Sequence, residues 1–187
     1  MRPAPPPPVK KRREFPYGHG FFLQRLLLFT ILVVFALVVL AFQLAAPAAW
    51  VGALGIALGV FVWVWGITPL FTNHWLTTTR LILRQGWYFR AAFPLREIES
   101  LEKFTGDVPL GLRARIGKRR LYVTGSRVGL LSIKLRTPRR FWAVLWAQAD
   151  EIVFDVDSPD AFLEGFGGRK SSLAPVQAER ADPYLRD

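Results

Sequence analysis

The sequence predicts an integral membrane protein of the α+β class, in which an N-terminal transmembrane helical hairpin carries a small, mostly antiparallel β domain with a C-terminal capping helix. Two observations lead to this prediction. Residues 26–71 contain no charged side chain, and after them the hydrophobic pattern changes from long continuous runs to short runs separated by turn residues. The 187 residues leave room for about one domain.

The first 25 residues have the composition of a tail. Residues 1–8 are nearly all proline and alanine, which favours polyproline II conformation and cannot build a core. A basic cluster, Lys10–Arg13, follows. We therefore expect residues 1–25 to be disordered, proline-rich and basic.

Two apolar runs follow, and each is long enough to cross a bilayer. Residues 26–46 include only Thr30 and Gln43 as polar side chains, and residues 48–71 are free of charge over 24 residues. A transmembrane helix needs about 20 such residues. Pro47 lies between the runs and predicts a tight turn. A cleavable signal peptide has a shorter apolar stretch of about 7 to 15 residues, so we expect the first helix to be retained.

The charges that flank the hairpin predict its orientation. Lys and Arg gather in cytoplasmic loops, and here they lie in Lys10–Arg13 before the first helix and at Arg80 and Arg84 after the second. Two spans return the chain to its starting side. We therefore expect a multi-pass protein of the inner (cytoplasmic) membrane, with both termini and the β domain on the cytoplasmic side.

The second predicted helix carries a glycine spacing that lets another helix approach closely. Gly55 and Gly59 form a small-xxx-small pair. The approaching helix belongs either to the same hairpin or to a second copy, and the sequence leaves both open. A homo-oligomer formed through Gly55 and Gly59 is the corresponding hypothesis.

After the hairpin, short apolar runs alternate with turn residues in the pattern of hairpin-connected strands. The predicted strands cover residues 74–77, 80–84, 87–93, 98–104, 120–124, 129–136 and 151–156. Ser158 suits an N-cap, Pro159 the first helical position and Asp160 the first turn, so a short closing helix is expected up to residue 166. The β domain thus spans residues 72–166, and the polar residues 167–187 are expected to be a disordered tail.

The order and spacing of residues in this region resemble a known family. The segments concerned are Trp75-Leu76-Thr77-x-x-Arg80-Leu81-Ile82-x-Arg84-x-Gly86, Pro94-Leu95-x-x-Ile98 and Val156-Asp157-Ser158-Pro159-Asp160-Ala161-Phe162. Together with the hairpin they resemble the membrane-anchored members of the bacterial pleckstrin-homology-like domain family. The resemblance implies a bent sheet of about seven strands capped by one helix. It implies no particular chemistry, because the members have no established chemistry in common.

A basic segment in the middle of the β domain is the first candidate contact. The formal net charge of the chain is +11, which favours anionic partners. The basic residues of this segment are Arg113, Arg115, Lys118, Arg119 and Arg120. Near an anionic leaflet each such side chain contributes about 1 kcal/mol when it lies within a Debye length of the surface. Contact with anionic lipid headgroups or a membrane protein partner is one interpretation, and a solvated loop is the other.

A second candidate group combines cations with large apolar side chains. Its members are Arg139, Arg140, Phe141, Trp142 and Trp146. The composition suits an interfacial amphipathic segment. If residues 138–150 form a helix, the aromatic side chains recur at i and i+4 and share a face with Leu145. This face either inserts at the membrane surface or packs on the sheet or on a partner, and packing within the protein is the interpretation we favour.

No catalytic signature stands out in the chain. Cysteine is absent, and the two histidines, His19 and His74, have no metal-ligand partner at a recognisable spacing. Asp155 and Asp157 alternate along a predicted strand, which would place two carboxylates on one face. We interpret them, with Asp160, as providing solubility and helix capping. The expectation is no enzymatic activity, no cofactor and no metal site.

The sequence thus predicts a non-enzymatic, membrane-anchored protein whose pleckstrin-homology-like domain mediates protein or lipid-headgroup interactions at the cytoplasmic membrane face. The alternative function is an accessory or assembly subunit of a larger membrane protein complex. Nucleic acid is not an expected partner. Basic and aromatic residues do interleave, as in single-strand binders, but no recognition motif of a nucleic-acid-binding fold is present.

Overall fold

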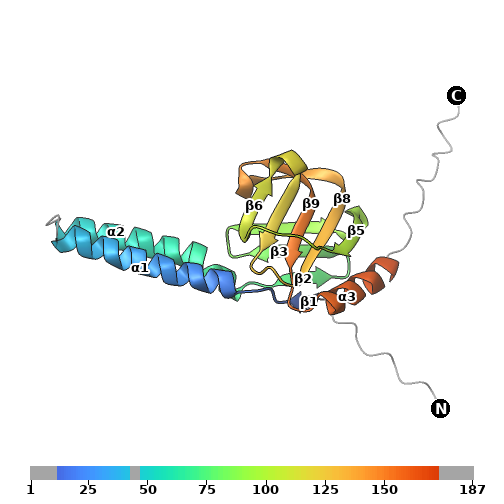
Figure 1. The fold of residues 1–187 in the computed structure, drawn as a ribbon, viewed down its shortest axis with the longest axis horizontal. Coiled ribbons are helices and arrows are strands. Elements are labelled where there is room, and N and C mark those ends of the chain that lie inside the picture. The colour runs from blue at the N-terminus through green and yellow to red at the C-terminus, as the bar shows by residue number, and fades with distance from the viewer. Residues whose placement is uncertain (1–11, 43–46, 173–187) are drawn as a thin grey trace, which may run out of the picture.

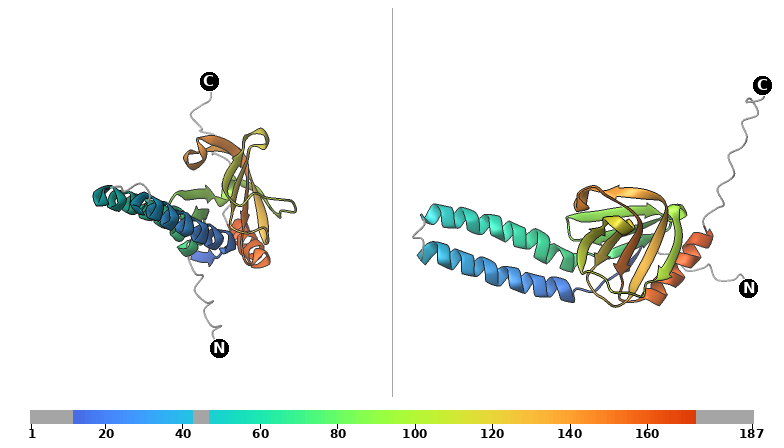
Figure 2. Two further views of the ribbon diagram at one scale, coloured as in Figure 1. Left: turned by 60° about the vertical axis from the view of Figure 1, so that its left-hand side comes forward. Right: turned by 45° about the horizontal axis from the view of Figure 1, so that its top comes forward.

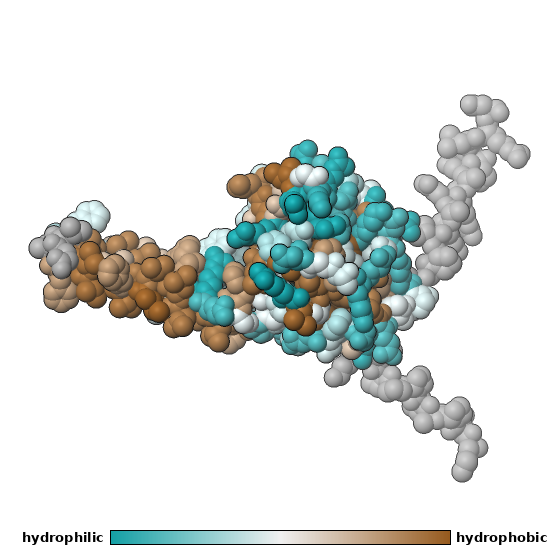
Figure 3. Space-filling model, in the orientation of Figure 1, coloured by the Kyte–Doolittle hydropathy of each residue, from teal (hydrophilic) through white to brown (hydrophobic). Residues whose placement is uncertain are grey.

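The computed structural model describes residues 12–42 and 47–172. Figure 1 shows two long helices, α1 and α2, which run side by side away from a β domain, and a third helix, α3, at the far end of that domain. The space-filling view in Figure 3 is almost uniformly apolar over the helical pair and mostly polar over the β domain. The molecule therefore consists of an apolar rod and a largely polar head.

Continuous runs of apolar side chains form helix α1 (Gly20–Phe42) and helix α2 (Ala48–Val62). After α2 the chain continues as a π-helical turn (Trp63–Ile67) and a 3-10 turn (Thr68–Phe71). Both helical segments are long and apolar enough to cross a membrane. The predicted pair of long apolar helices is confirmed, although α1 begins six positions before the predicted residue 26, at Gly20.

The two glycines singled out in α2 have different surroundings. A Cβ atom at Gly55 would lie 3.8 Å from Leu37 Cδ1 of α1, whereas a Cβ atom at Gly59 would have no described atom within 4 Å. Gly66, in the π-helical turn, approaches α1 more closely, because a Cβ atom there would lie 3.0 Å from Leu26 Cδ1. Gly55 thus faces α1, the side of α2 at Gly59 is open, and homo-oligomerisation stays a prediction.

The first sheet contains four antiparallel strands in the order β1-β2-β3-β4. They are β1 (Arg12–Phe15), β2 (His74–Thr77), β3 (Arg80–Gln85) and β4 (Phe89–Pro94). Strand β1 precedes α1 and pairs with β2, which follows the second helical segment. The structure therefore differs from the predicted disordered tail of residues 1–25. Residues 12–25 form a strand, a connection and the first turns of α1, and residues 1–11 lie outside the described residues.

The second sheet contains five strands in the order β5-β8-β9-β7-β6. They are β5 (Ile98–Lys103), β6 (Gly111–Arg115), β7 (Arg120–Thr124), β8 (Leu130–Phe141) and β9 (Ala147–Asp155). Neighbours are antiparallel except β7 and β9, which run parallel. The described residues thus contain nine strands rather than about seven, and the two additional strands are β1 and β6.

The core of the domain is built from alternate side chains of the strands and from one face of α3 (Pro159–Ser172). Leu81 of β3 and Ile133 of β8 are fully buried, as expected when successive strand residues point to opposite faces. Phe162 of α3 packs against Phe154 of β9, with ring centroids 5.5 Å apart. Helix α3 therefore closes the domain, as the sequence predicts.

Helix α3 continues beyond residue 166, where the predicted closing helix ends. Arg169 donates a hydrogen bond to a backbone carbonyl of β2, and Lys170 Nζ donates one to a backbone carbonyl of β5 at 3.0 Å. These bonds hold the last turn of the helix on both sheets. The helix thus covers the start of the tail predicted for residues 167–187, and residues 173–187 lie outside the described residues.

Candidate functional site

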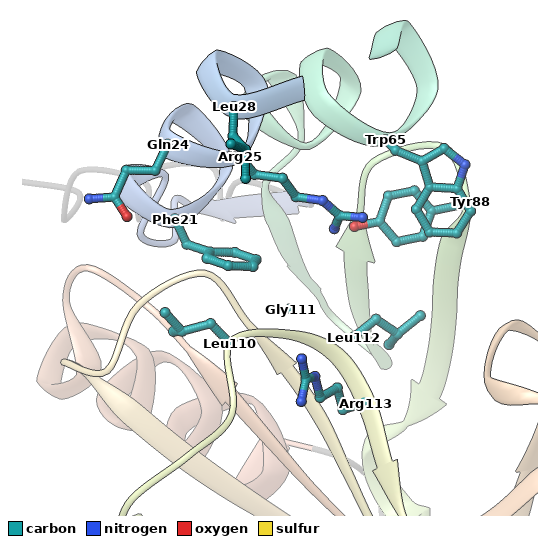
Figure 4. A pocket seen from close by; sticks show the side chains of 10 residues that line it. All are labelled: Phe21, Gln24, Arg25, Leu28, Trp65, Tyr88, Leu110, Gly111, Leu112 and Arg113. Atoms are coloured by element: carbon teal, nitrogen blue, oxygen red, sulfur yellow. The ribbon is translucent and has the colours of Figure 1, made fainter. Parts of the chain in front are cut away.

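A cavity lies where the first turns of α1 meet strand β6, at the base of the helical pair (Figure 4). Its volume is about 500 Å³, within the range of roughly 300–1,000 Å³ typical of small-molecule sites. The residues that line it are Phe21, Gln24, Arg25, Leu28, Trp65, Tyr88, Leu110, Gly111, Leu112 and Arg113. None of these residues is acidic.

Two arginines reach this cavity from different elements. Arg25 extends from α1 toward Trp65 and Tyr88, and Arg113 comes from β6 on the other side (Figure 4). The guanidinium of Arg25 lies 5.8 Å from the ring centroid of Trp65, a cation–π contact that orients the charge without neutralising it. Among the described residues, neither arginine forms an ion pair with a carboxylate. The cavity is therefore cationic.

An aromatic pair forms one wall of the cavity. The rings of Trp65 and Tyr88 are stacked, with centroids 4.4 Å apart and an interplanar angle of 18°. The Tyr88 hydroxyl points toward the Arg25 guanidinium (Figure 4). Burial raises the pKa of Tyr88 to about 12, and the nearby charge of Arg25 acts in the opposite direction. At neutral pH the phenol keeps its proton and is available as a hydrogen-bond donor.

A glycine brings β6 close to α1 at this point. Gly111 has a φ angle of 88°, in the left-handed region that favours glycine. A Cβ atom at this position would also lie 3.3 Å from the ring of Phe21. The close approach of strand and helix that forms the cavity thus depends on a residue without a side chain.

Of the five basic residues predicted from the middle segment, Arg113 lines this cavity. The segment is a β-hairpin rather than a loop, because a 3-10 turn at Ile116–Lys118 joins β6 to β7. The other exposed members are Arg115, Lys118 and Arg119. Arg120 is paired instead, with its Nη2 atom 2.6 Å from Glu151 Oε2 on β9. The structure therefore does not gather all five in one contact surface.

The second predicted group does not form a helix. Strand β8 runs to Phe141, a 3-10 turn covers Trp142–Val144, and β9 begins at Ala147. The helix considered for residues 138–150 is thus wrong, and the segment is the tip of a long β-hairpin. Phe141 is buried in the core, so packing within the protein holds for that aromatic side chain.

Three large apolar side chains at this tip are exposed, and we call them the aromatic tip. They are Trp142, Leu145 and Trp146, which are 65%, 95% and 70% exposed. Leu145 and Trp146 have φ angles of 55° and 61°, a region that bulky side chains rarely adopt. Packing within the protein, the interpretation that the sequence favoured, therefore does not hold for the aromatic tip.

The two arginines before the aromatic tip differ in their contacts. Arg139 Nη2 lies 2.9 Å from Glu97 Oε2, and Arg139 Nη1 donates a hydrogen bond to the carbonyl oxygen of Ala92 at 2.8 Å. Arg140 is exposed and forms no ion pair with any described carboxylate. Arg139 thus fixes the hairpin to β4, whereas Arg140 is available for an external partner.

A buried carboxylate joins the segment before α1 to the β domain. Asp155 is fully buried, and its side chain accepts hydrogen bonds from the backbone N–H groups of Gly18 at 2.8 Å and Gly125 at 2.7 Å. Burial raises the pKa of Asp155 to about 7, against the lowering effect of these donors. The predicted solubility role is thus wrong for Asp155, whose carboxylate is an internal anchor.

An aromatic stack lies at the same junction. The ring of Tyr17 stacks on His74 with centroids 4.7 Å apart, and the Tyr17 hydroxyl donates a hydrogen bond to the carbonyl oxygen of Pro69 at 2.7 Å. His74 is fully buried, and burial lowers its pKa to about 3, so the imidazole is neutral at neutral pH. Neither His74 nor Asp155 lines the cavity at α1. In the described part of the chain, no cluster of three or more His, Cys, Asp or Glu side chains is placed to hold a metal ion.

The cavity includes residues that sequence reasoning did not single out. Arg25 of α1 and Tyr88 of the turn between β3 and β4 are two such residues, and they meet Trp65 of the π-helical turn only in the folded chain. A signal did exist for Arg25, which is the last charged residue before the uncharged residues 26–71. A cation at the end of an apolar helix is typical of a membrane boundary.

No family model matches the chain, and comparisons with curated proteins and with solved structures give no match either. The class of protein is therefore defined by its own architecture. It combines a pair of long apolar helices with a two-sheet β domain, a cationic cavity at their junction and an exposed aromatic tip.

Proposed function

We propose that the chain is a non-enzymatic membrane-anchored protein, in which α1 and α2 insert in the cytoplasmic membrane and the β domain binds the headgroup layer on the cytoplasmic face. The observation that carries this proposal is the position of the aromatic tip. In Figures 1 and 2 the tip of the β8–β9 hairpin lies on the side of the domain from which the helices leave, level with their ends. An inserted hairpin would bring this tip to the membrane surface.

The surface of the helical pair supports insertion in lipid. In the most apolar stretch of α1 no residue is buried inside the protein, and in the most apolar stretch of the second helical segment only 11% of the residues are buried. The buried core helix of a soluble protein would show the opposite. Soluble monomers rarely expose contiguous apolar patches of more than a few hundred Å², because exposing apolar surface to water costs about 25 cal/mol per Å². A bilayer removes this cost.

Strand β1 argues against a cleavable signal sequence. Cleavage after α1 would remove β1, whose four residues pair with β2, and Tyr17, which is buried in the junction. The chain leaves the first sheet through β1 and returns to it through β2. Because the strands before and after the helical pair are paired in one sheet, both ends of the pair lie together, which supports two spans with both connections on one side of the membrane.

The distribution of charge supports a cytoplasmic position for the β domain. Arg12, Arg13 and Arg25 lie before or in the first turns of α1, and Arg80 and Arg84 lie on β3, shortly after the second helical segment. Lys and Arg within about 15–20 residues of a span favour the cytoplasmic side. Contact of these cations with an anionic leaflet would add about 1 kcal/mol each near the surface.

The coarse architecture also supports the pleckstrin-homology-like assignment. Mostly antiparallel strands are followed by a closing helix, as the resemblance implies, although the strands form two sheets and not the one bent sheet that it implies. The β1 and β6 strands and the parallel β7–β9 pair go beyond the seven strands that it implies. The proposed role depends on the exposed surface of the domain and would hold for another two-sheet fold as well.

Site-directed fluorescence in proteoliposomes tests this proposal. The chain has no cysteine, so the variant Leu145→Cys carries a single environment-sensitive probe at the aromatic tip. The matched control is Glu102→Cys, an exposed position on β5, which lies on the side of the domain away from the helices (Figure 1). We expect blue-shifted emission and quenching by headgroup-attached nitroxide lipids for the tip probe alone. Equal emission and quenching at the two positions would contradict docking of the tip.

A second candidate function is an accessory subunit of a larger membrane complex. The open side of α2 at Gly59 favours it, because a small residue with no neighbouring atom leaves room for another helix. This function predicts that a partner copurifies at fixed stoichiometry in mild detergent. It also predicts that Gly59→Leu disrupts the complex, whereas Gly55→Leu would disturb the α1–α2 contact first.

A further inference from the structure

We propose that the cavity between α1 and β6 binds the phosphate of an anionic phospholipid headgroup, held between Arg25 and Arg113. The inference deepens the proposed function and rests on it, because the lipid reaches the cavity only if α1 is in the membrane. The ligand class is an anionic glycerophospholipid, for which phosphatidylglycerol is the probe.

The positive charge of the cavity favours an anionic ligand. Arg25 and Arg113 line one cavity of about 500 Å³ whose lining residues include no carboxylate, and neither side chain has an ion-pair partner among the described residues. Like charges that share a partly enclosed site repel each other more strongly than in bulk water. A bound anion would give both guanidinium groups an oppositely charged partner.

The donors around the cavity match a phosphate group. A guanidinium presents a planar fork of N–H groups that binds two phosphate oxygens at once. Arg25 and Arg113 supply two such forks from different elements, and the Tyr88 hydroxyl, which points toward Arg25, supplies a further O–H donor (Figure 4). A tetrahedral anion with several acceptor oxygens can use all of these donors together.

The remaining walls of the cavity are apolar, which identifies the source of the phosphate. Phe21, Leu28 and the ring of Trp65 line the side formed by the helices. Leu28 lies about one turn further along α1 than Arg25, where the helix carries no further charged side chain. A phospholipid has this polarity, with the phosphate at the arginines and acyl chains along the helix. A free phosphate would leave the apolar walls uncovered, so we assign the site to a lipid.

Native mass spectrometry of the full chain in detergent, titrated with phosphatidylglycerol or phosphatidylcholine, tests the proposal. We expect phosphatidylglycerol to bind at least about tenfold more tightly than the zwitterionic lipid. Arg25→Gln and Arg113→Gln should each weaken its binding about tenfold or more, because each removes a charge-assisted contact. Arg96→Gln is the matched control, since Arg96 is exposed and lies outside the cavity. The near-ultraviolet circular dichroism of each variant verifies its fold.

Each other outcome overturns a specific part of the proposal. Equal binding of the two lipids, or equal effects of Arg96→Gln and the two cavity variants, would show that the cavity is not the lipid site. Full competition by soluble glycerol 3-phosphate would assign the site to a free phosphate instead. Flotation of the same variants with liposomes separates the two levels. Flotation without selective lipid binding refutes this inference alone, whereas loss of flotation of the unmodified chain refutes the proposed function as well.

Discussion

Replacing the buried carboxylate of Asp155 by an amide should change how the stability of the protein depends on pH. Burial raises the pKa of Asp155 from 3.8 to about 7. Between about pH 4 and pH 7 the folded chain therefore keeps a proton at this site that the unfolded chain has lost, and stability falls as the pH rises through this window. At about 1.4 kcal/mol per pKa unit, this difference corresponds to about 4 kcal/mol. The Asp155→Asn variant cannot titrate and should lose this dependence.

The pKa of His74 is shifted in the opposite direction, so its effect on stability opposes that of Asp155 in the unmodified chain and appears alone in the variant. Burial lowers the pKa of His74 from 6.5 to about 3. The unfolded chain is protonated first as the pH falls below 6.5, so this group stabilises the fold fully above that pH and progressively less toward pH 3. Between about pH 4 and 6.5 the effects of Asp155 and His74 on stability largely cancel. In Asp155→Asn the effect of His74 remains alone, and stability should rise with pH.

The amide also introduces a local hydrogen-bond mismatch that is independent of pH. Its NH2 group cannot accept a hydrogen bond, so one of the backbone N–H groups of Gly18 and Gly125 loses its acceptor, at a cost of about 1–3 kcal/mol. We therefore expect Asp155→Asn to be less stable than the unmodified chain at pH 4.5 and more stable at pH 8. The free-energy difference between the two proteins should shift by about 3 kcal/mol across this range, because pH 4.5 already lies above the ordinary pKa of the carboxyl group.

The assay is thermal unfolding of the full chain in detergent, followed by near-ultraviolet circular dichroism from pH 4.5 to pH 8. For a domain of 60–100 residues, about 1 kcal/mol corresponds to roughly 4–8 °C in Tm, so the expected shift is large. Asp157→Asn is the control, because Asp157 is exposed and lies two positions further along the chain. Parallel pH profiles for Asp155→Asn and the unmodified chain would refute the reasoning, and would mean that the backbone donors keep the carboxylate ionised.

Two further predictions concern the contacts that fix the hairpins and the junction. Gly125→Ala should lower the stability by about 1–3 kcal/mol, because its Cβ atom would lie 2.0 Å from the carbonyl oxygen of Gly18. Gly117→Ala, with no described atom near its Cβ, should be neutral in the same thermal unfolding assay, and equal Tm values for the two variants would contradict the close packing. Arg139→Gln should cost about 1 kcal/mol, since its ion pair is partly exposed and screened by solvent. Arg140→Gln should leave Tm unchanged. A larger decrease in Tm for Arg140→Gln than for Arg139→Gln would contradict the conclusion that Arg139 is the arginine that fixes the hairpin to β4.

Elements with a strong local pattern could be predicted from the sequence. The two helices follow from the absence of charge over residues 26–71, and the seven predicted strands all correspond to observed ones, with ends that differ by a few residues. Strand β1 was missed because Phe15 is its only buried residue, which leaves no alternating pattern to detect. Its pairing with β2 is a tertiary contact across the whole helical pair, and local sequence carries no information on it.

The candidate sites show the same limit. Arg113 was identified from its charge. Arg25 and Tyr88, which line the same cavity, are brought near it only by the approach of α1 to β6. In the second group, the i, i+4 spacing of aromatic residues favoured a helix. The segment instead forms a 3-10 turn at the end of β8, where the chain reverses direction into β9. The positive φ angles of Leu145 and Trp146 and the exposure of their side chains have no signature in residue type.

The cavity and the aromatic tip are linked through one strand. Arg113 lies on β6, which contacts the turn at Trp142–Val144 as well as the start of α1. An anion held between Arg25 and Arg113 would fix β6 against α1 and, through β6, the distance of the aromatic tip from the helices. Pairing of β1 with β2 and the hydrogen bonds of Asp155 restrain the same junction from the opposite side. If the proposed membrane-bound state forms, the depth of the tip at the membrane surface would therefore be set by the junction and not by the tip residues alone.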